Sequence, residues 1–311
     1  MKILFIDIVH PILQERLTNA GYECIDGTKL SREECETIIT DISGVVVRSR
    51  LQMNASFLSH AKQLKFIARS GAGMENIDLA YCEKNNITLY NAPEGNRNAV
   101  GEHALGMLLS LFNRLHLADR EVRIGKWDRE GNRGIELDGK TVGIIGFGNN
   151  GAAFAKKLRG FEVEILAYDK YKSGFGNEYI KEASLEELYQ NCDVVSFHIP
   201  QNEETIYFAN DEFFDSFRKK IYLINLSRGK VVKTSSLVYS LKNGKVLGAC
   251  LDVLEYEKSS FESFFDGKEE IHPDFDYLLN SEKVMLSPHV GGWTVESYFK
   301  LSNVLADKIL K

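Results

Sequence analysis

The first third of the chain alternates short apolar runs with stretches of helical periodicity. The clearest apolar runs are residues 3–9, 44–48, 64–69 and 87–90. Helical patterns separate them, at residues 11–20, 31–40, 54–61 and 77–84. Because buried strands that alternate with helices assemble into parallel sheets, this pattern predicts an open α/β unit over residues 1–97.

A second series of strands follows, and a long helical pattern joins it to the first. Its apolar runs are residues 142–145, 163–168, 194–199, 221–225, 248–253 and 284–287. The joining pattern covers residues 100–123, and its centre, LGMLLSLF, is apolar almost all round, which predicts a helix buried on most sides. Such a helix fits a core position or one shared by a hinge and a subunit interface. A final helical pattern, residues 295–310, is expected to pack back on the first series.

Residues 141–169 carry the most chemical information. A buried strand ends at three glycines with the spacing G-x-G-x-x-G, and a helical pattern and a second strand follow. Gly146 permits a tight turn, Gly148 leaves room for a pyrophosphate, and Gly151 lets helix and strand pack closely. At the end of the second strand, Asp169 can accept hydrogen bonds from both ribose hydroxyls and would repel a 2′-phosphate. The segment therefore predicts an NAD site rather than an NADP site.

Composition narrows the class of protein. The chain has 311 residues, 44% apolar and 26% charged, which suits a soluble globular protein of two domains. Its formal net charge of −6, without a long basic run, argues against nucleic acid as a partner. No apolar stretch approaches the roughly 20 residues of a membrane helix, and the first is too short for a signal sequence. Five scattered cysteines, not in metal-binding spacing, indicate reduced thiols in a cytoplasmic protein; no metal site is predicted.

Three side chains with suitable chemistry follow strands of the second series. They are Arg228 in INLSRGKVV, Glu257 in CLDVLEYEK and His289 in LSPHVGGWT. Because ligands of open α/β sheets bind beyond the carboxyl ends of the strands, all three are expected to face one crevice. An imidazole can take a hydroxyl proton near neutral pH, a carboxylate can fix its tautomer, and a guanidinium can bind a substrate carboxylate. Together they predict hydride transfer; each alone also fits a structural role.

A set of segments in a fixed order resembles one family. These segments are SGAGMENID at 70–78, NAPEGNRNAVGEHALGMLL at 91–109, the glycine turn, HIP at 198–200 with Thr205, INLSRGKVV at 224–232, GACLDV at 248–253 and SPHVGG at 287–292. Over nearly its whole length the chain resembles the D-isomer-specific 2-hydroxyacid dehydrogenases. The resemblance implies an α/β fold with two doubly wound parallel-sheet domains. It places a Rossmann NAD-binding domain, residues 98–287, within a flavodoxin-like substrate domain, residues 1–97 plus 288–311.

The resemblance also implies roles in catalysis and substrate binding. Arg228, Glu257 and His289 match the family's catalytic arginine, glutamate and histidine. Ala72 and Gly73 match a loop whose backbone N–H groups receive the substrate carboxylate, which is physically sensible because converging N–H donors stabilise an anion. The implied partner is a small 2-hydroxy or 2-oxo acid.

For the cofactor, NAD, the resemblance implies a set of contacts along the second domain. Asp252 matches the acid that holds the nicotinamide carboxamide, and residues 198–200 match a wall of the adenine pocket. The other residues of the predicted site are Gly146, Gly148, Asn149, Asn150, Gly151, Asp169, His198, Ile199, Pro200, Thr205, Leu226 and Gly291.

The chain departs from the family pattern at several points. Lys258 replaces the usual proline after the glutamate, and the segment 258–283 is longer than the family norm. This segment is expected to be a surface excursion, with a lid or a subunit contact as alternatives. Trp293 replaces a small residue and is expected to narrow the site, Asn150 replaces an apolar residue, and Gly101 replaces an alanine without expected consequence.

The substrate is predicted from VVVRSRLQ, residues 45–52. If this segment is extended, Arg48 and Arg50 point to one side and suit a dianion. It resembles the RSR segment of D-3-phosphoglycerate dehydrogenases, which favours 3-phosphoglycerate and a role in serine biosynthesis. A glyoxylate/hydroxypyruvate or D-lactate type reductase is the alternative, and Glu257 disfavours a formate dehydrogenase, which would have glutamine there. The chain stops after its last helix, so feedback through a regulatory domain is not expected.

Two further expectations concern assembly and a rival function. A homodimer is expected through the helix region 100–123, and neither a membrane nor nucleic acid is expected as a partner. The rival is an NAD-sensing scaffold like the corepressors that share this fold, because such proteins can keep all three catalytic residues. Turnover of any 2-hydroxy acid separates the two functions.

Overall fold

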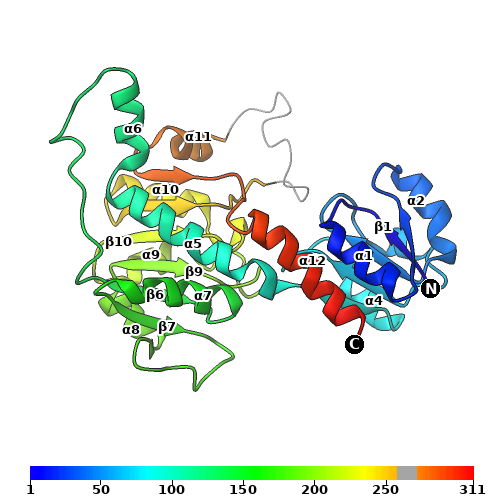
Figure 1. Ribbon diagram of the computed structural model, residues 1–311. Helices are drawn as coiled ribbons and strands as arrows, with labels where there is room; N and C mark the ends of the chain where they lie inside the picture. The colour runs from blue at the N-terminus through cyan, green and yellow to red at the C-terminus, as the bar shows by residue number, and fades with distance from the viewer. Residues whose placement is uncertain (258–271) are drawn as a thin grey trace. The chain divides into compact units, whose positions relative to one another are not determined.

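The computed structural model describes residues 1–257 and 272–311, which form two compact units (Figure 1). The first unit contains Met1–Arg97 and Trp293–Lys311. The second contains Asn98–Glu257 and, among the described residues, 272–292. The return to the first unit thus lies beyond the predicted boundary at residue 287, so the loop that carries His289 belongs to the second unit. The first part of the 258–283 excursion, residues 258–271, lies outside the described residues.

The first unit is a five-stranded parallel sheet with helices between its strands. The strands are β1 (Lys2–Phe5), β2 (Glu23–Asp26), β3 (Gly44–Val47), β4 (Phe66–Arg69) and β5 (Thr88–Asn91). The helices are α1 (Pro11–Asn19), α2 (Arg32–Ile38), η1 (Ile39–Asp41), α3 (Ala55–Leu58), α4 (Leu79–Lys84) and α12 (Val295–Ile309). The strand order is β2-β1-β3-β4-β5 with every pair parallel, which is the flavodoxin-like order.

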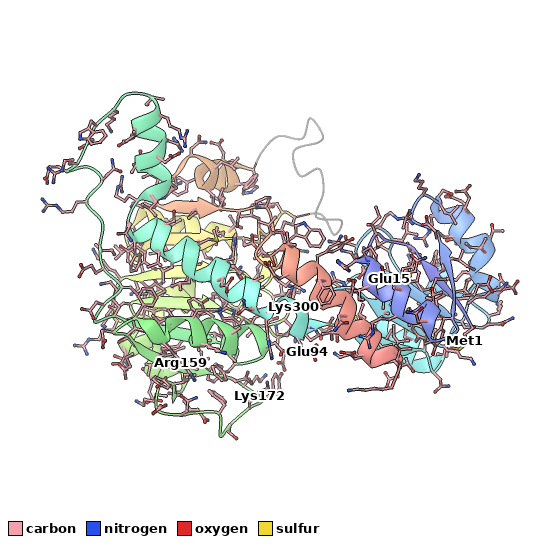
Figure 2. The ribbon with its side chains drawn as sticks, viewed as in Figure 1. Met1, Glu15, Glu94, Arg159, Lys172 and Lys300 are labelled. Atoms are coloured by element: carbon pink, nitrogen blue, oxygen red, sulfur yellow. The ribbon has the colours of Figure 1, made fainter. Side chains whose placement is uncertain are left out.

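The C-terminal helix α12 completes the core of the first unit, as its apolar pattern predicted. Leu301 and Leu305 of α12 pack in one buried cluster with Leu13 and Leu17 of α1. Charged residues of these helices, such as Glu15, lie on the exposed side (Figure 2). Each helix therefore presents one apolar stripe to the sheet, and the first unit depends on the last residues of the chain.

The second unit is a seven-stranded parallel sheet. Its strands are β6 (Thr141–Ile145), β7 (Glu164–Tyr168), β8 (Lys181–Glu182), β9 (Val194–Phe197), β10 (Ile221–Asn225), β11 (Val246–Leu251) and β12 (Val284–Leu286). Its helices are α5 (Pro93–Phe112, entering from the first unit), α6 (Leu115–Arg123), α7 (Asn149–Lys157), η2 (Leu158–Gly160), α8 (Leu185–Asn191), α9 (Asp211–Ser216), η3 (Gly229–Val231), α10 (Thr234–Lys242) and α11 (Pro273–Asn280).

The strand order of the second sheet is β12-β11-β10-β9-β6-β7-β8. From β6 the chain first adds strands on one side, β7 and β8, and then on the other side, from β9 to β12, so the order of connection reverses at β6. This is the doubly wound arrangement of dinucleotide-binding domains, in which ligands bind outside the carboxyl ends of the strands at the reversal. Neighbouring residues such as Ile144 and Ile145 enter separate buried clusters, because successive side chains of a strand point to opposite faces. Helices cover both faces, which explains why the strands are continuous apolar runs.

The helical pattern of residues 100–123 is two helices, not the single helix predicted. α5 ends at Phe112 and α6 begins at Leu115. Between them Arg114 adopts the left-handed conformation, with φ of 52°. An interior helical residue cannot take this conformation, so the chain changes direction there. The apolar centre of α5 is buried against the second sheet.

All five cysteines are free thiols, as the sequence predicted. In the part of the chain that the structure describes, no helix is both long and apolar enough to cross a membrane. Within the same residues, no group of three or more histidine, cysteine, aspartate or glutamate side chains is arranged to hold a metal ion.

Candidate functional site

The glycine turn joins β6 to α7 with little space to spare. Gly146 has a φ of 95°, and a Cβ there would lie 2.7 Å from the carbonyl oxygen of His198. A Cβ on Gly151 would lie 2.1 Å from the carbonyl oxygen of Gly146, so helix and turn touch. Gly148 instead faces open space, and no side chain caps the first N–H groups of α7. The turn therefore fits a pyrophosphate, which would meet bare backbone and the positive end of the helix.

Asp169 follows β7 and is fixed beside this turn. Its Oδ2 accepts the backbone N–H of Phe147 at 2.8 Å. Its Oδ1 accepts the N–H groups of Tyr171 and Lys172 at 2.9 and 3.0 Å. The carboxylate thus lies at the end of the second strand, next to the glycine turn, where the sequence placed a ribose acceptor.

The segment 198–205 borders the turn with its backbone more than with its histidine ring. The His198 imidazole packs against Phe154 at 5.5 Å, and its Nε2 is 2.8 Å from the Ser196 hydroxyl. Burial lowers the pKa of His198 to about 3, so the ring is neutral at physiological pH. Thr205 donates its hydroxyl to the Pro200 carbonyl at 2.6 Å and so fixes the loop. The role of residues 198–200 as a wall of the adenine pocket, which the resemblance implies, stays a prediction.

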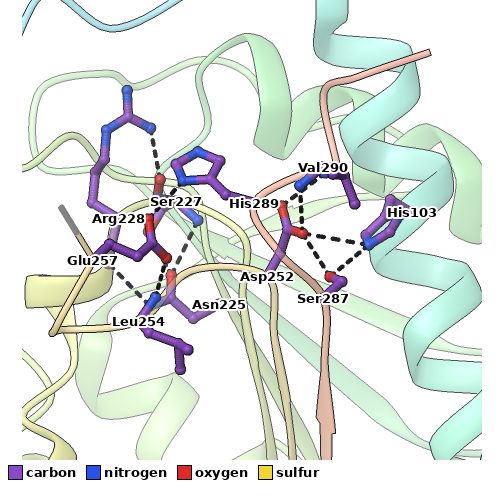
Figure 3. A network of polar contacts seen from close by, with 11 residues as sticks. His103, Asn225, Ser227, Arg228, Asp252, Leu254, Glu257, Ser287, His289 and Val290 are labelled. Carbon is purple, nitrogen blue, oxygen red and sulfur yellow. Dashed lines mark hydrogen bonds and ion pairs between the residues drawn. The ribbon is translucent and has the colours of Figure 1, made fainter. Parts of the chain in front are cut away.

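Arg228 lies in a short loop after β10, and Asn225 at the end of that strand shapes the loop. The Asn225 side chain donates to the Arg228 carbonyl at 3.0 Å and accepts from the Ser227 backbone and hydroxyl at 3.1 and 2.8 Å. The Arg228 guanidinium donates to the Ser227 carbonyl at 2.6 Å (Figure 3). A Cβ on Gly229 would lie 1.9 Å from the Leu254 carbonyl oxygen, so this loop packs directly on the loop after β11.

His289 and Glu257 form the hydrogen-bonded pair that the sequence proposed. The His289 Nδ1 is 2.7 Å from Glu257 Oε2, and both side chains are mostly buried. The other carboxylate oxygen of Glu257 accepts the Leu254 backbone N–H, so the carboxylate is held from two sides (Figure 3). Because an ionised carboxylate only accepts, Nδ1 carries the hydrogen and Nε2 is the nitrogen suited to exchange a proton with a ligand.

The loop that carries His289 is fastened to Asp252, at the end of β11. His289 itself has a φ of 55°, in the left-handed region that few residues other than glycine adopt. Its N–H donates to the Asp252 carbonyl at 2.8 Å. The Asp252 carboxylate accepts the N–H groups of Val290 and Gly291 at 2.9 and 2.8 Å. One buried residue therefore holds an unusual backbone conformation in place.

In the first unit, Arg50 serves the fold. Its guanidinium donates to the carbonyl of Ile6 at 2.7 and 2.9 Å, of Gly27 at 3.0 Å and of Leu30 at 2.7 Å. These acceptors lie in two segments of the first unit, just after β1 and in the turn after β2, and the guanidinium ties both to the segment after β3. The geometry therefore gives no support to Arg50 as a ligand for a substrate phosphate.

Arg48 has different surroundings from Arg50, contrary to the expectation that both point to one side. β3 ends at Val47, and the chain then turns around Asp7, whose Oδ2 accepts the N–H of Arg48 at 2.6 Å and of Arg50 at 3.4 Å. The Arg48 guanidinium lies over the Trp293 ring, 4.0 Å from its centroid. Arg48 and Arg50 lie beyond the end of β3, in a bend. Their side chains therefore do not follow the alternation expected for a strand.

Ala72 and Gly73 lie in the loop after β4, which is tied to the end of β5. The Ala72 carbonyl accepts the Asn91 side-chain amide at 2.7 Å, and the Gly71 carbonyl accepts the Ala92 N–H at 2.9 Å. The carbonyl groups of Gly71 and Ala72 thus form hydrogen bonds within the first unit. Their role in binding a carboxylate stays a prediction.

Sequence reasoning missed the polar residues that surround Asp252. Ser287 donates its hydroxyl to Asp252 Oδ1 at 2.6 Å, and His103 lies 2.9 Å from that hydroxyl (Figure 3). His103 lies in the middle of α5, directly before its apolar centre, where a partly buried polar side chain needs a partner. The need for a polar partner could have marked His103 as a residue of interest. Its partner Ser287 is distant in sequence, so only the fold identifies the pair.

Comparison with protein families agrees with this geometry. Residues 105–291 match the model of the D-isomer specific 2-hydroxyacid dehydrogenase NAD binding domain. A D-3-phosphoglycerate dehydrogenase of Archaeoglobus fulgidus is 34% identical over 100% of this chain, but the match covers only 57% of that protein. A hydroxypyruvate reductase of Thermotoga maritima is 32% identical over 91% of this chain and 88% of its own length. The chain thus spans little more than half of the phosphoglycerate dehydrogenases that it matches.

Solved structures show the same two-unit architecture. The D-lactate dehydrogenase of Aquifex aeolicus, in complex with NAD and lactic acid, aligns with a TM-score of 0.84 at 26% identity. The alignment covers 100% of this chain and 94% of that one. An NADPH-dependent glyoxylate/hydroxypyruvate reductase of Sinorhizobium meliloti aligns with a TM-score of 0.82, also at 26% identity, over 99% of this chain and 93% of that one.

Proposed function

Because the chain belongs to the D-isomer specific 2-hydroxyacid dehydrogenase family, we propose that it is an NAD-dependent enzyme that interconverts a D-2-hydroxy acid and its 2-oxo acid. The observation that carries the proposal is the His289–Glu257 pair at 2.7 Å, in the unit that also holds the glycine turn and Asp169. When bound, the nicotinamide ring supplies or accepts the hydride.

The chemistry assigned to this chain is proton transfer and charge stabilisation. During oxidation, His289 Nε2 takes the hydroxyl proton as the hydride leaves the substrate carbon, and a carbonyl forms. Glu257 holds the imidazole in this tautomer and stabilises the imidazolium. Arg228 provides a guanidinium for the substrate carboxylate and for the charge that develops on the oxygen. In the first unit, the N–H groups of Ala72 and Gly73 are assigned to the same carboxylate.

Three substrates are candidates, each with its own support. Similarity to D-3-phosphoglycerate dehydrogenases supports 3-phosphoglycerate and its oxidised form, 3-phosphohydroxypyruvate, and with it a place in serine biosynthesis. The use of the Arg50 guanidinium by three backbone carbonyls favours an unphosphorylated acid such as hydroxypyruvate, as does the long match to a hydroxypyruvate reductase. D-lactate is a further alternative.

A panel of 2-oxo acids tests the function directly. The purified protein is mixed with NADH and either 3-phosphohydroxypyruvate, hydroxypyruvate, glyoxylate or pyruvate, and the loss of NADH absorbance is followed. We expect turnover with at least one acid. NADH binding without turnover of any acid would contradict the enzyme proposal and favour an NAD-sensing scaffold.

The side chain of Arg50 gives a prediction about stability. Arg50→Ala should lower the free energy of unfolding by about 1–3 kcal/mol, because it leaves carbonyls without their charged donor. Activity towards phosphorylated and unphosphorylated acids should fall equally, if at all. Urea denaturation and kcat/KM on both acids measure this. A loss confined to 3-phosphohydroxypyruvate at unchanged stability would instead show that Arg50 binds the phosphate.

Asp169 gives a prediction about cofactor choice. Asp169→Asn keeps a side-chain oxygen as acceptor but removes the charge that repels a 2′-phosphate. Because a hydrogen bond to a charged group contributes ~1.5–3 kcal/mol, kcat/KM for NADH should fall about ten- to a hundredfold. The ratio of NADPH to NADH use should rise. A wild-type protein that already prefers NADPH would show that Asp169 does not set the preference.

A homodimer through α5 and α6 is also part of the proposal. Leu115, Val122, Ile124 and Trp127 expose 52–81% of their surface on α6 and the segment after it. Several exposed large apolar residues within one short stretch of chain support a protein interface there. Sedimentation of the wild type and of Trp127→Ser at equal concentration tests this region; two identical profiles would contradict it.

A further inference from the structure

His103 has a polar environment that the proposed chemistry does not use. It lies on α5, with 29% of its side chain exposed, and its Nε2 is 2.9 Å from the Ser287 hydroxyl and 3.6 Å from Asp252 Oδ1. The Ser287 hydroxyl in turn is 2.6 Å from the same oxygen of Asp252, whose side chain is only 3% exposed (Figure 3). A helix distant in sequence thus reaches the residue that fastens the His289 loop.

Counting hydrogens fixes the direction of this chain of contacts. The Asp252 carboxylate accepts two backbone N–H groups and cannot donate when ionised. The single hydrogen of the Ser287 hydroxyl therefore goes to Asp252 at 2.6 Å, rather than to the weak acceptor Sδ of Met107 at 3.6 Å. The hydroxyl is then left as an acceptor towards His103, whose Nε2 must carry a hydrogen.

Packing joins the same residues on the other side of the loop. A Cβ on Gly291 would lie 2.8 Å from Asp252 Oδ2 and 3.4 Å from Cδ2 of His103. The loop backbone is thus confined between the carboxylate and the imidazole. Between Ser287 and Gly291 lies His289, whose φ of 55° requires such support.

From these contacts we infer that His103 is a positioning residue for His289, a role that rests on the proposed proton transfer by His289. The Nε2–H of His103 orients the Ser287 hydroxyl onto Asp252, and Asp252 holds the loop so that the His289 ring meets Glu257. His103 touches no reacting atom in this scheme. Its effect is to keep the acid–base group in one geometry, and a misplacement of about 1 Å can cost 10²-fold in rate.

Substitution of His103 separates positioning from packing. His103→Leu keeps a helix former of similar size without the donor, whereas His103→Gln places an amide N–H near the position of Nε2. We expect kcat to fall about ten- to a hundredfold in the leucine variant. We expect the glutamine variant to stay close to wild type. His60→Leu, at an exposed position of the first unit, is the surface control.

Ser287 provides the second arm. Ser287→Ala should lower kcat about as much as His103→Leu, and the double variant should lose little more, because both changes interrupt one chain of contacts. Additive losses, a glutamine variant as impaired as the leucine variant, or a leucine variant with normal kcat would each overturn the inference.

A readout independent of turnover distinguishes this inference from the proposed function. In protein labelled with 15N-histidine, the His103 signal, identified by its loss in His103→Gln, should show a hydrogen on Nε2. The ring signal of His289 should shift in His103→Leu. If the wild type turns over no 2-oxo acid, the enzyme proposal fails, and these spectra still test the role of His103. A hydrogen on Nδ1 of His103 alone would overturn that role. A His289 signal that does not shift in His103→Leu would overturn it as well.

Discussion

Replacing His289 by asparagine should lower turnover by about 10²–10⁴-fold, the usual contribution of a general acid–base group. Asparagine is the informative substitution because His289 has a φ of 55°, a conformation that asparagine tolerates better than alanine does. The loop should therefore keep its backbone while it loses the group that exchanges the proton. Stopped-flow reduction of the best 2-oxo acid measures the loss of turnover, and titration with NADH by fluorescence measures the affinity for the cofactor.

The affinity for NADH should remain nearly unchanged in this variant, because the glycine turn and Asp169 are intact. A variant with near-normal turnover would refute the role of His289. The direction of the pH dependence provides a control on the wild type. Reduction needs the imidazolium and should slow as the pH rises, whereas oxidation needs the neutral ring and should slow as the pH falls. The same direction for both reactions would contradict proton transfer by His289.

Arg228→Ala should produce the second large loss, and in two parameters at once. Removing a donor aimed at a developing charge costs about 10²–10³-fold in kcat. KM for the 2-oxo acid should rise as well, because the guanidinium also binds the carboxylate. Initial rates over a range of 2-oxo acid concentrations at saturating NADH separate the two effects.

Arg228→Lys is the matched control, because lysine keeps the charge but lacks the planar fork. It should recover part of the affinity and little of kcat. An alanine variant with a raised KM and a normal kcat would mean that Arg228 binds substrate and transition state equally, so that it has no part in the chemical step.

The order of strands and helices could be predicted where local signals were strong. The glycine turn was found because each glycine answers a steric need, which the structure shows at Gly146 and Gly151. β2 could not be predicted, because its sequence, ECID, is not a continuous apolar run. It has charged residues at both ends, and in the structure the strand is partly exposed. The break at Arg114 was missed because the apolar pattern continues across it and a single left-handed residue leaves no periodic signal.

The three candidate catalytic residues could be proposed from their positions after strands, but their surroundings could not. The contact between His103 and Ser287 joins α5 to the end of β12, and no local pattern encodes it. The prediction that Arg50 binds the substrate rests on a resemblance and on an extended segment, and the extended segment is not what the structure shows. The turn around Asp7 and the carbonyls that bind the guanidinium become visible only when three segments of the sheet are assembled.

The position of α12 has a consequence for the order in which the protein is made. Leu301, Leu305 and Ala306 complete a core whose other members lie within the first 92 residues of the chain. During synthesis, the residues that pack against α12 leave the ribosome first. Their apolar face stays uncovered until α12 has been translated. The second unit, complete by residue 292, folds during that delay. The unit that is translated first is therefore completed last.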